Sequence, residues 1–329
     1  MKTTQKLVLG ICALIVLALL APRFILFAFF DKAPPPGQIV EVDGVSLHIY
    51  CKGPDSEVPI VIEAGAGAAS PVYHWLVETL ASTNRVCVWD RPGLGWSEAD
   101  GIPDGEKVTS YLHAVLEEAD VNRPVLMVGH SLGGLHIRIY QDKYPGEVAG
   151  LVFLDSTHPK ILDKTGGTFE DEVARAKARG GVIQRIKAFL GITRLAGFTS
   201  ETGLEQFFTP EVEKQLVYTG SRWNLYDNAI NEAKGFERTS DRTAKTGHLG
   251  DLPVLVISAG VPVSQAALPP ELDETERHEI WMEAQLDLAS LSANSEHTTI
   301  ENADHMGLVI MKDRAEEVAG HIMALVSRI

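Results

Sequence analysis

The chain has 329 residues, of which 45% are apolar and 22% charged, as is typical of a globular protein with a sizeable core. Its net charge of -15 argues against nucleic acid as a partner, because binding a polyanion requires clustered Lys and Arg. No histidine pair has the spacing of metal ligands with a supporting carboxylate, so neither a metal nor another cofactor is expected.

Residues 1–37 predict a membrane anchor followed by a Pro-rich spacer. The apolar runs 7–21 and 24–30 can together cross a hydrocarbon layer of ~30 Å, with Arg23 near the far interface. A poor cleavage site favours a single-pass anchor over a cleaved signal peptide, with secretion as the alternative. The lysines before the span favour an extracytoplasmic location for the rest of the chain. Residues 33–37 then form a stiff spacer.

From residue 38 onward, β-rich runs alternate with helical patterns. This alternation predicts a mostly parallel, eight-stranded sheet with helices on both faces, and ligands then bind beyond the carboxyl ends of the strands. The expected strands are 39–42, 45–51, 59–63, 85–89, 125–128, 148–154, 254–258 and 298–300.

The alternation breaks once, after Asp155, where helical patterns continue without a clear strand until Val254. We therefore expect a helical cap over residues 157–250. It would divide an α/β core into a first part, 38–156, and a second part, 251–329.

Two of the three cysteines, Cys51 and Cys87, lie in expected strands of the soluble part. The pattern favours two small, buried apolar side chains. A disulfide between them is the alternative, and an extracytoplasmic location would favour it.

The sequence Gly129-His130-Ser131-Leu132-Gly133 lies between an expected buried strand and an expected helix. Glycines two residues before and after a serine permit a tight, strained turn that exposes the serine hydroxyl. The same turn would aim the backbone N–H of Leu132 at a developing oxyanion. Ser131 is therefore the candidate nucleophile.

With this turn, the chain resembles the α/β-hydrolase family. Residues 90–97 match the family's D-x-x-G-x-G-x-S turn, 129–134 match its nucleophile turn, and 302–308 match its late histidine segment. The three motifs occur in the family's order, and the resemblance covers nearly everything from residue 38 onward. It implies an oxyanion hole, a catalytic histidine and an acid around Ser131.

The family's first oxyanion donor follows its third strand, which here gives Glu63-Ala64-Gly65-Ala66-Gly67. By position, the N–H groups of Ala66 and Leu132 would hold the oxyanion. For Glu63, a structural hydrogen-bonding role is favoured over a catalytic one. The substrate-binding residues predicted beside the hole are Gly65, His130 and Trp75.

His305 follows the last expected strand and is the predicted base. The acid commonly follows the seventh strand in this family, but residues 259–264 contain no carboxylate. Asp155, which ends the preceding strand, is the favoured acid, and Glu271 or Asp273 is the alternative.

The resemblance implies acyl transfer to water through a covalent intermediate. Carboxylic ester hydrolysis of a small hydrophobic molecule is the favoured reaction. Thioesterase, amidase or peptidase, and lactonase activities are alternatives, as is a non-catalytic binding protein on the same scaffold. Epoxide hydrolysis in this family uses an aspartate nucleophile, and Ser131 argues against it.

Overall fold

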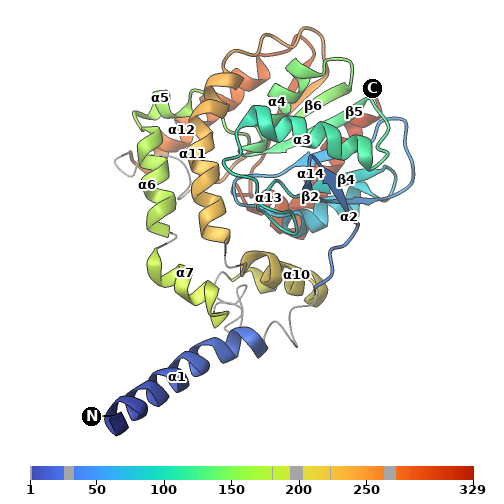
Figure 1. The fold of residues 1–329 in the computed structure, drawn as a ribbon. Coiled ribbons are helices and arrows are strands. Elements are labelled where there is room, and N and C mark those ends of the chain that lie inside the picture. The colour runs from blue at the N-terminus through green and yellow to red at the C-terminus, as the bar shows by residue number, and fades with distance from the viewer. Residues whose placement is uncertain (1, 26–32, 180, 193–202, 223, 263–271) are drawn as a thin grey trace.

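The computed structural model describes residues 2–25, 33–179, 181–192, 203–222, 224–262 and 272–329. These residues form an eight-stranded sheet with helices around it (Figure 1). The strands are β1 (Gln38–Val42), β2 (Val45–Lys52), β3 (Ile60–Glu63), β4 (Val86–Trp89), β5 (Val125–His130), β6 (Val148–Leu154), β7 (Val254–Ala259) and β8 (Ser295–Ile300).

The strand order is β1-β2-β4-β3-β5-β6-β7-β8. β2 runs antiparallel to both β1 and β4, whereas the pairs from β4 through β3 to β8 are parallel. The prediction of a mostly parallel, eight-stranded α/β-hydrolase sheet is therefore confirmed. The carboxyl ends of β3, β5, β6 and β7 lie side by side at one edge of the sheet.

Helices cover both faces because successive residues of each central strand point to opposite sides. In β3, Ile60 and Ile62 join the core on one face and Val61 joins the core on the other. The first core includes α2 (His74–Leu80), α13 (Gly307–Ile310) and α14 (Lys312–Val326). The second includes α3 (Gly105–Glu118), α4 (Gly133–Lys143) and the end of α12 (Glu274–Ala289).

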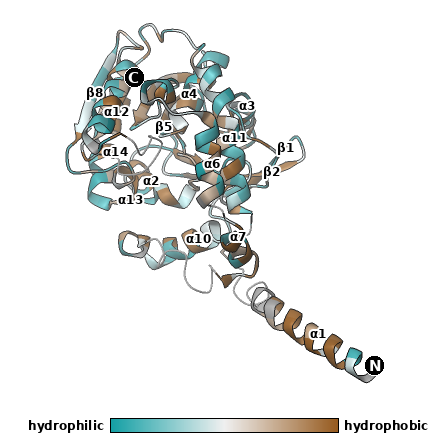
Figure 2. Cartoon of the chain, turned by 90° about the vertical axis from the view of Figure 1, so that its left-hand side faces the viewer, coloured by the Kyte–Doolittle hydropathy of each residue, from teal (hydrophilic) through white to brown (hydrophobic). Residues whose placement is uncertain are grey.

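Between β6 and β7, the described residues are helical. α6 and α11 run side by side in both views of the molecule, and α11 also packs on α3 and α4 (Figures 1 and 2). The elements are α5 (Ile161–Thr165), α6 (Phe169–Arg179), α7 (Val182–Phe189), the 3-10 helix η3 (Leu204–Phe207), α10 (Pro210–Gly220) and α11 (Leu225–Thr243).

The N-terminal helix α1 (Lys2–Ile25) is largely hydrophobic (Figure 2). Among the described residues, however, no helix is long and apolar enough to cross a membrane. The predicted single-pass anchor, and the extracytoplasmic location inferred from it, were therefore wrong. The uncharged run 7–21 has 15 residues, fewer than the roughly 20 that a span requires. The predicted continuation over 26–30 lies outside the described residues.

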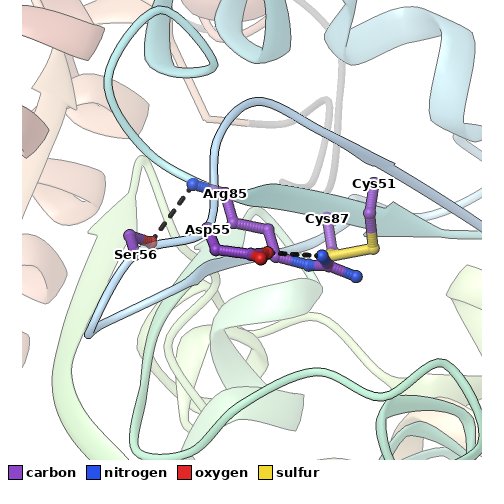
Figure 3. The surroundings of a disulfide bond; sticks show 5 residues. All are labelled: Cys51, Asp55, Ser56, Arg85 and Cys87. Atoms are coloured by element: carbon purple, nitrogen blue, oxygen red, sulfur yellow. Dashed lines mark hydrogen bonds and ion pairs between the residues drawn. A yellow bond between two sulfur atoms is a disulfide. The ribbon is translucent and has the colours of Figure 1, made fainter.

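Cys51 and Cys87 form a disulfide (Figure 3). The strand order explains the pairing, because antiparallel β2 and β4 place these two residues directly opposite each other, with their Cα atoms 4.0 Å apart. The alternative is thus the observed state, and the favoured pair of free thiols was wrong. The sequence could not predict this disulfide, because the alternation of strands and helices along the chain does not reveal which strands are neighbours in the sheet.

Candidate active site

Ser131 lies at a sharp turn between β5 and α4. Its backbone has φ +53°, in the left-handed region that side chains rarely adopt. A Cβ atom at Gly133 would lie 2.2 Å from the carbonyl oxygen of Glu63 at the end of β3. The turn can therefore pack against the neighbouring strand only with glycine at this position, which is the physical content of the sequence motif.

Asp155 and His305 are in contact, although 150 residues separate them in the chain. Asp155 follows β6 in a second left-handed turn, with φ +42°, and is completely buried. Its Oδ2 accepts a hydrogen bond from Nδ1 of His305 at 2.6 Å. Its Oδ1 accepts the backbone N–H of Ala259 at 3.1 Å and the indole N–H of Trp281 at 2.9 Å.

Burial by itself raises the pKa of Asp155, but the hydrogen bonds from His305 and Trp281 outweigh it, so the pKa lies below its usual value. Asp155 is therefore a carboxylate. Because that carboxylate accepts a hydrogen bond from the N–H at Nδ1, the Nε2 of the neutral His305 ring is left as an acceptor.

His130 is buried behind His305, and the two rings stack with centroids 4.6 Å apart. The Tyr73 hydroxyl accepts the N–H of Gly65 at 2.7 Å and lies 2.9 Å from Nδ1 of His130. Because the carbonyl of His305 can only accept, Nε2 of His130 donates to it at 3.2 Å, and in the neutral ring Nδ1 accepts a hydrogen bond from the Tyr73 hydroxyl. Burial, followed by the nearby His305, lowers the pKa of His130 to about 3, so the ring is neutral.

Two cavities meet at Ser131, and Ala66 and Gly67 line both. The larger cavity, of about 410 Å³, is also lined by Gly65, Ala68, Ala69, Val72, Leu94, Gly95, His130, Leu204, Leu216, Thr219, Gly220, Leu225, His305 and Met306. The smaller cavity, of about 240 Å³, is also lined by Leu132, Thr157, Glu172, Arg175, Ala176, Tyr226, Ala229, Glu232, Ala233 and Phe236.

Ala66 and Leu132, whose backbone N–H groups are the predicted oxyanion donors, both line the smaller cavity together with Ser131. The N–H groups on either side of Ala66 are occupied, since Gly65 donates to Tyr73 and Gly67 donates to Glu232. In the part of the chain that the structure describes, the N–H groups of Ala66 and Leu132 have no acceptor, and both residues line the smaller cavity next to Ser131. Two free donors therefore flank the candidate nucleophile.

The loop that contains Ala66 is held by a buried arginine that the sequence reasoning did not single out. Arg91 is 1% exposed and donates to the carbonyls of Ala64 at 2.6 Å and Gly65 at 2.7 Å. Its guanidinium also pairs with Glu63 at 3.0 Å and with Glu232 at 2.7 Å. The second carboxylate oxygen of Glu232, a residue of α11, accepts the N–H of Gly67 at 2.6 Å. The loop is thus fixed from both the sheet and the helical segment.

The electrostatics of this cluster are mutually supporting. Burial lowers the pKa of Arg91, but Glu232 and Glu63 raise it by more. Burial raises the pKa of Glu63, but hydrogen bonding from His136 and the charge of Arg91 bring it below its usual value. Glu63 therefore has the structural hydrogen-bonding position that was favoured for it, bonded to Trp89 and His136 as well as to Arg91.

The remaining predicted site residues lie as follows. Gly65 and His130 line the larger cavity, but Trp75 lines neither, and its indole N–H donates to the carbonyl of Phe207 at 2.7 Å. Asp273 is exposed and caps α12 in a capping box, and Glu271 lies outside the described residues. Among the described residues, no cluster of three potential metal ligands occurs.

Comparison with known proteins supports the fold. Residues 58–191 match the family model described as alpha/beta hydrolase fold. An uncharacterized protein of Schizosaccharomyces pombe is 27% identical over 338 residues, an alignment that covers 90% of this chain. The chain spans only 58% of the length of that relative.

Solved structures share the fold. An epoxide hydrolase from Vigna radiata has a TM-score of 0.67 at 17% identity, covering 89% of this chain and 98% of its own. A thermophilic esterase from Thermogutta terrifontis has a TM-score of 0.63 at 18% identity, covering 88% and 98%. The chain therefore has the alpha/beta-hydrolase fold, which it shares with an esterase and an epoxide hydrolase.

Replacing Arg91 should destabilise the fold, because its carboxylate partners are buried. We expect Arg91→Met to lower the free energy of unfolding by about 3–5 kcal/mol, because Glu63 and Glu232 would lose their common counter-ion. The deficit should shrink as the pH falls, because Glu63, whose pKa Arg91 helps to lower, then takes up a proton more readily in the variant. Urea denaturation from pH 7 to pH 4 measures both effects.

The matched control is Arg222→Met, because Arg222 donates to the backbone carbonyls of Gly95 and Ser97 and leaves no carboxylate unpaired in those contacts. This variant should lower the free energy of unfolding by about 1–2 kcal/mol, and the loss should not depend on pH. Equal and pH-independent losses in both variants would contradict the role assigned to Arg91.

His130 should make folding stability depend on pH. Its pKa is about 3 in the folded chain but about 6.5 when unfolded, so below pH 6.5 only the unfolded state binds the proton. The free energy of unfolding should therefore decrease as the pH is lowered. Between pH 6 and pH 4, His130 should contribute up to ~1.4 kcal/mol per pH unit to this decrease. In His130→Gln, the unfolding free energy should have a flatter pH profile. Parallel profiles for the two proteins would rule the assignment out.

Proposed function

We propose that this protein is a serine hydrolase that cleaves carboxylic esters of hydrophobic small molecules. The observation that carries the proposal is the hydrogen-bonded Asp155–His305 pair, with His305 and Ser131 lining one cavity and two unpaired N–H groups beside the serine. This is the donor, base and nucleophile set that acyl transfer needs.

In the proposed reaction, the Ser131 hydroxyl oxygen attacks the ester carbonyl carbon while Nε2 of His305 accepts the hydroxyl proton. The carbonyl oxygen becomes an oxyanion, held by the N–H groups of Ala66 and Leu132. The bond to the alcohol oxygen then breaks, and His305 returns the proton to that oxygen. Water, deprotonated by His305, attacks the acyl-enzyme and releases the carboxylic acid and a regenerated serine.

Asp155 would act on His305 and not on the substrate. Its carboxylate holds the imidazole in the tautomer with Nε2 free and stabilises the imidazolium that forms in each step. The neutral His130 ring stacked on His305 adds no positive charge beside that imidazolium. His130 and Tyr73 are therefore positioning groups in this proposal, since they hold the backbone of His305 and of Gly65.

The cavity walls favour a hydrophobic ester. Leucine, valine, alanine and methionine side chains dominate the lining, and the charged side chains that reach it are paired. We also propose that residues 157–250 act as a cap over the core segments 38–156 and 251–329, because α6, α10 and α11 supply much of both linings. An aspartate nucleophile, which epoxide hydrolysis in this family uses, is absent from position 131.

The first test is Ser131→Ala. Hydrolysis of p-nitrophenyl butanoate should fall by a factor of about 10⁴ or more, because the acyl-enzyme cannot form. A fluorophosphonate probe should label the wild-type chain and not the variant. If the wild-type protein turns over the ester no faster than Ser131→Ala, the enzyme proposal is wrong. The alternative of a non-catalytic binding protein would then be favoured.

The second test compares two carboxylates. Asp155→Asn should lower kcat by about 10⁴, because an amide at this position no longer enforces the productive tautomer of His305. Asp273→Asn is the matched control, since asparagine also caps helices and Asp273 contacts only α12 in the capping box. It should keep kcat within about twofold. The reverse ranking would assign the acid to Asp273.

A further inference from the structure

The two cavities that meet at Ser131 differ in size and in chemistry. Among the described residues, no Asp, Glu, Lys or Arg lines the larger cavity, of about 410 Å³. It runs between the loop that contains Ala66 and the elements η3 and α10, which supply Leu204 and Leu216. An uncharged, apolar group suits these walls.

The smaller cavity, of about 240 Å³, lies between α6 and α11. Ala176 and Ala229 line it from these two helices. Its charged groups are already paired, because Arg175 contacts Glu172 and Glu232 contacts Arg91. It therefore offers less room and a more polar wall than its neighbour.

The geometry of acyl transfer distinguishes the two cavities. A tetrahedral carbon bound to Ser131 has three other substituents, namely the oxyanion, the leaving oxygen and the acyl carbon. The oxyanion points toward the N–H groups of Ala66 and Leu132, which would bind it. Two directions remain for the two halves of the ester, and two cavities are available.

The position of His305 determines which half of the ester lies in which cavity. The leaving oxygen must lie beside Nε2 of His305, which protonates it. His305 lines the larger cavity and is absent from the lining of the smaller one, whereas Leu132 lines only the smaller. With the leaving oxygen on the side of His305, the acyl carbon can point only toward α6 and α11. The opposite orientation would leave the alkoxide without a proton donor.

We propose that the substrate is a neutral ester with a bulky, apolar alcohol half in the larger cavity and a smaller acyl half in the cavity between α6 and α11. This inference rests on the proposed function and adds to it the orientation and class of the ester. Leu204 and Val72 then select the alcohol, and Ala176 and Ala229 limit the length of the acyl group.

The test uses two isomeric esters, octyl propanoate and propyl octanoate, which have the same atoms on opposite sides of the carbonyl group. The measured quantity is the ratio of kcat/KM for octyl propanoate to that for propyl octanoate. A ratio is unaffected by partial misfolding of a variant, because the active fraction cancels. The wild-type ratio should exceed one.

Filling one cavity at a time should move this ratio in opposite directions. Leu204→Trp narrows the larger cavity and should lower the ratio by about tenfold or more, whereas Ala176→Phe narrows the smaller and should raise it similarly. Val72→Phe and Ala229→Phe repeat the two changes from other elements. Val182→Trp, at an α7 position that is 73% exposed and lines neither cavity, should leave the ratio unchanged.

The outcomes separate this inference from the proposed function. Opposite shifts support the assignment, and shifts with the signs exchanged, or no shift in either variant, overturn it. A chain that fluorophosphonate labels at Ser131 but that cleaves neither ester also overturns the ester class and leaves the serine chemistry intact. Cleavage of both esters undiminished in Ser131→Ala overturns the proposed function and this inference with it.

Discussion

Arg91 carries a positive charge into the interior, and two separate parts of the chain close around it. The end of β3 and the loop after it supply Glu63 and the carbonyls of Ala64 and Gly65, and α11 supplies Glu232. A buried guanidinium is stable only with its charge and its N–H groups satisfied, so these parts are constrained to one arrangement. Among the described residues, that arrangement leaves the N–H of Ala66 without an acceptor, between the occupied N–H groups of Gly65 and Gly67.

The parallel sheet supplies the second constraint, because it brings the carboxyl ends of β3, β5 and β6 to one edge. Ser131 follows β5 and Asp155 follows β6, and both backbones adopt left-handed conformations. Strained turns of this kind persist only where the surrounding packing enforces them, and they gather at functional sites. The strain at Asp155 is therefore an independent structural reason to regard it as more than a strand-end charge.

The helical segment between β6 and β7 contributes to the site in two ways. Glu232 extends from α11 into the core cluster, and the same helix lines the smaller cavity with Ala229. A change in the packing of α11 would therefore alter both the loop that carries Ala66 and the space beside Ser131. Solved structures with the same fold include an esterase and an epoxide hydrolase, so the fold alone leaves the reaction open.

The sequence by itself determined what depends on near neighbours. Short apolar, β-rich runs defined the central strands, and the glycines around Ser131 defined its turn, because each is a local property of the chain. The polar sequence of β8 revealed only half of that strand, since an edge strand buries few of its side chains. The apolar N-terminus led to a wrong prediction. Its local hydropathy suggested a membrane span, but α1 is not long and apolar enough to form one.

Tertiary structure alone decided the contacts between distant residues. The Asp155–His305 bond, the Cys51–Cys87 disulfide and the Arg91–Glu232 pair join positions 150, 36 and 141 residues apart. Each requires the order of strands in the sheet or the way a helix packs on it, and neither is encoded in local propensity. The sequence could name Ser131 as the candidate nucleophile, but only the folded chain brings Asp155 and His305 into contact and places His305 and Ala66 in one cavity with Ser131.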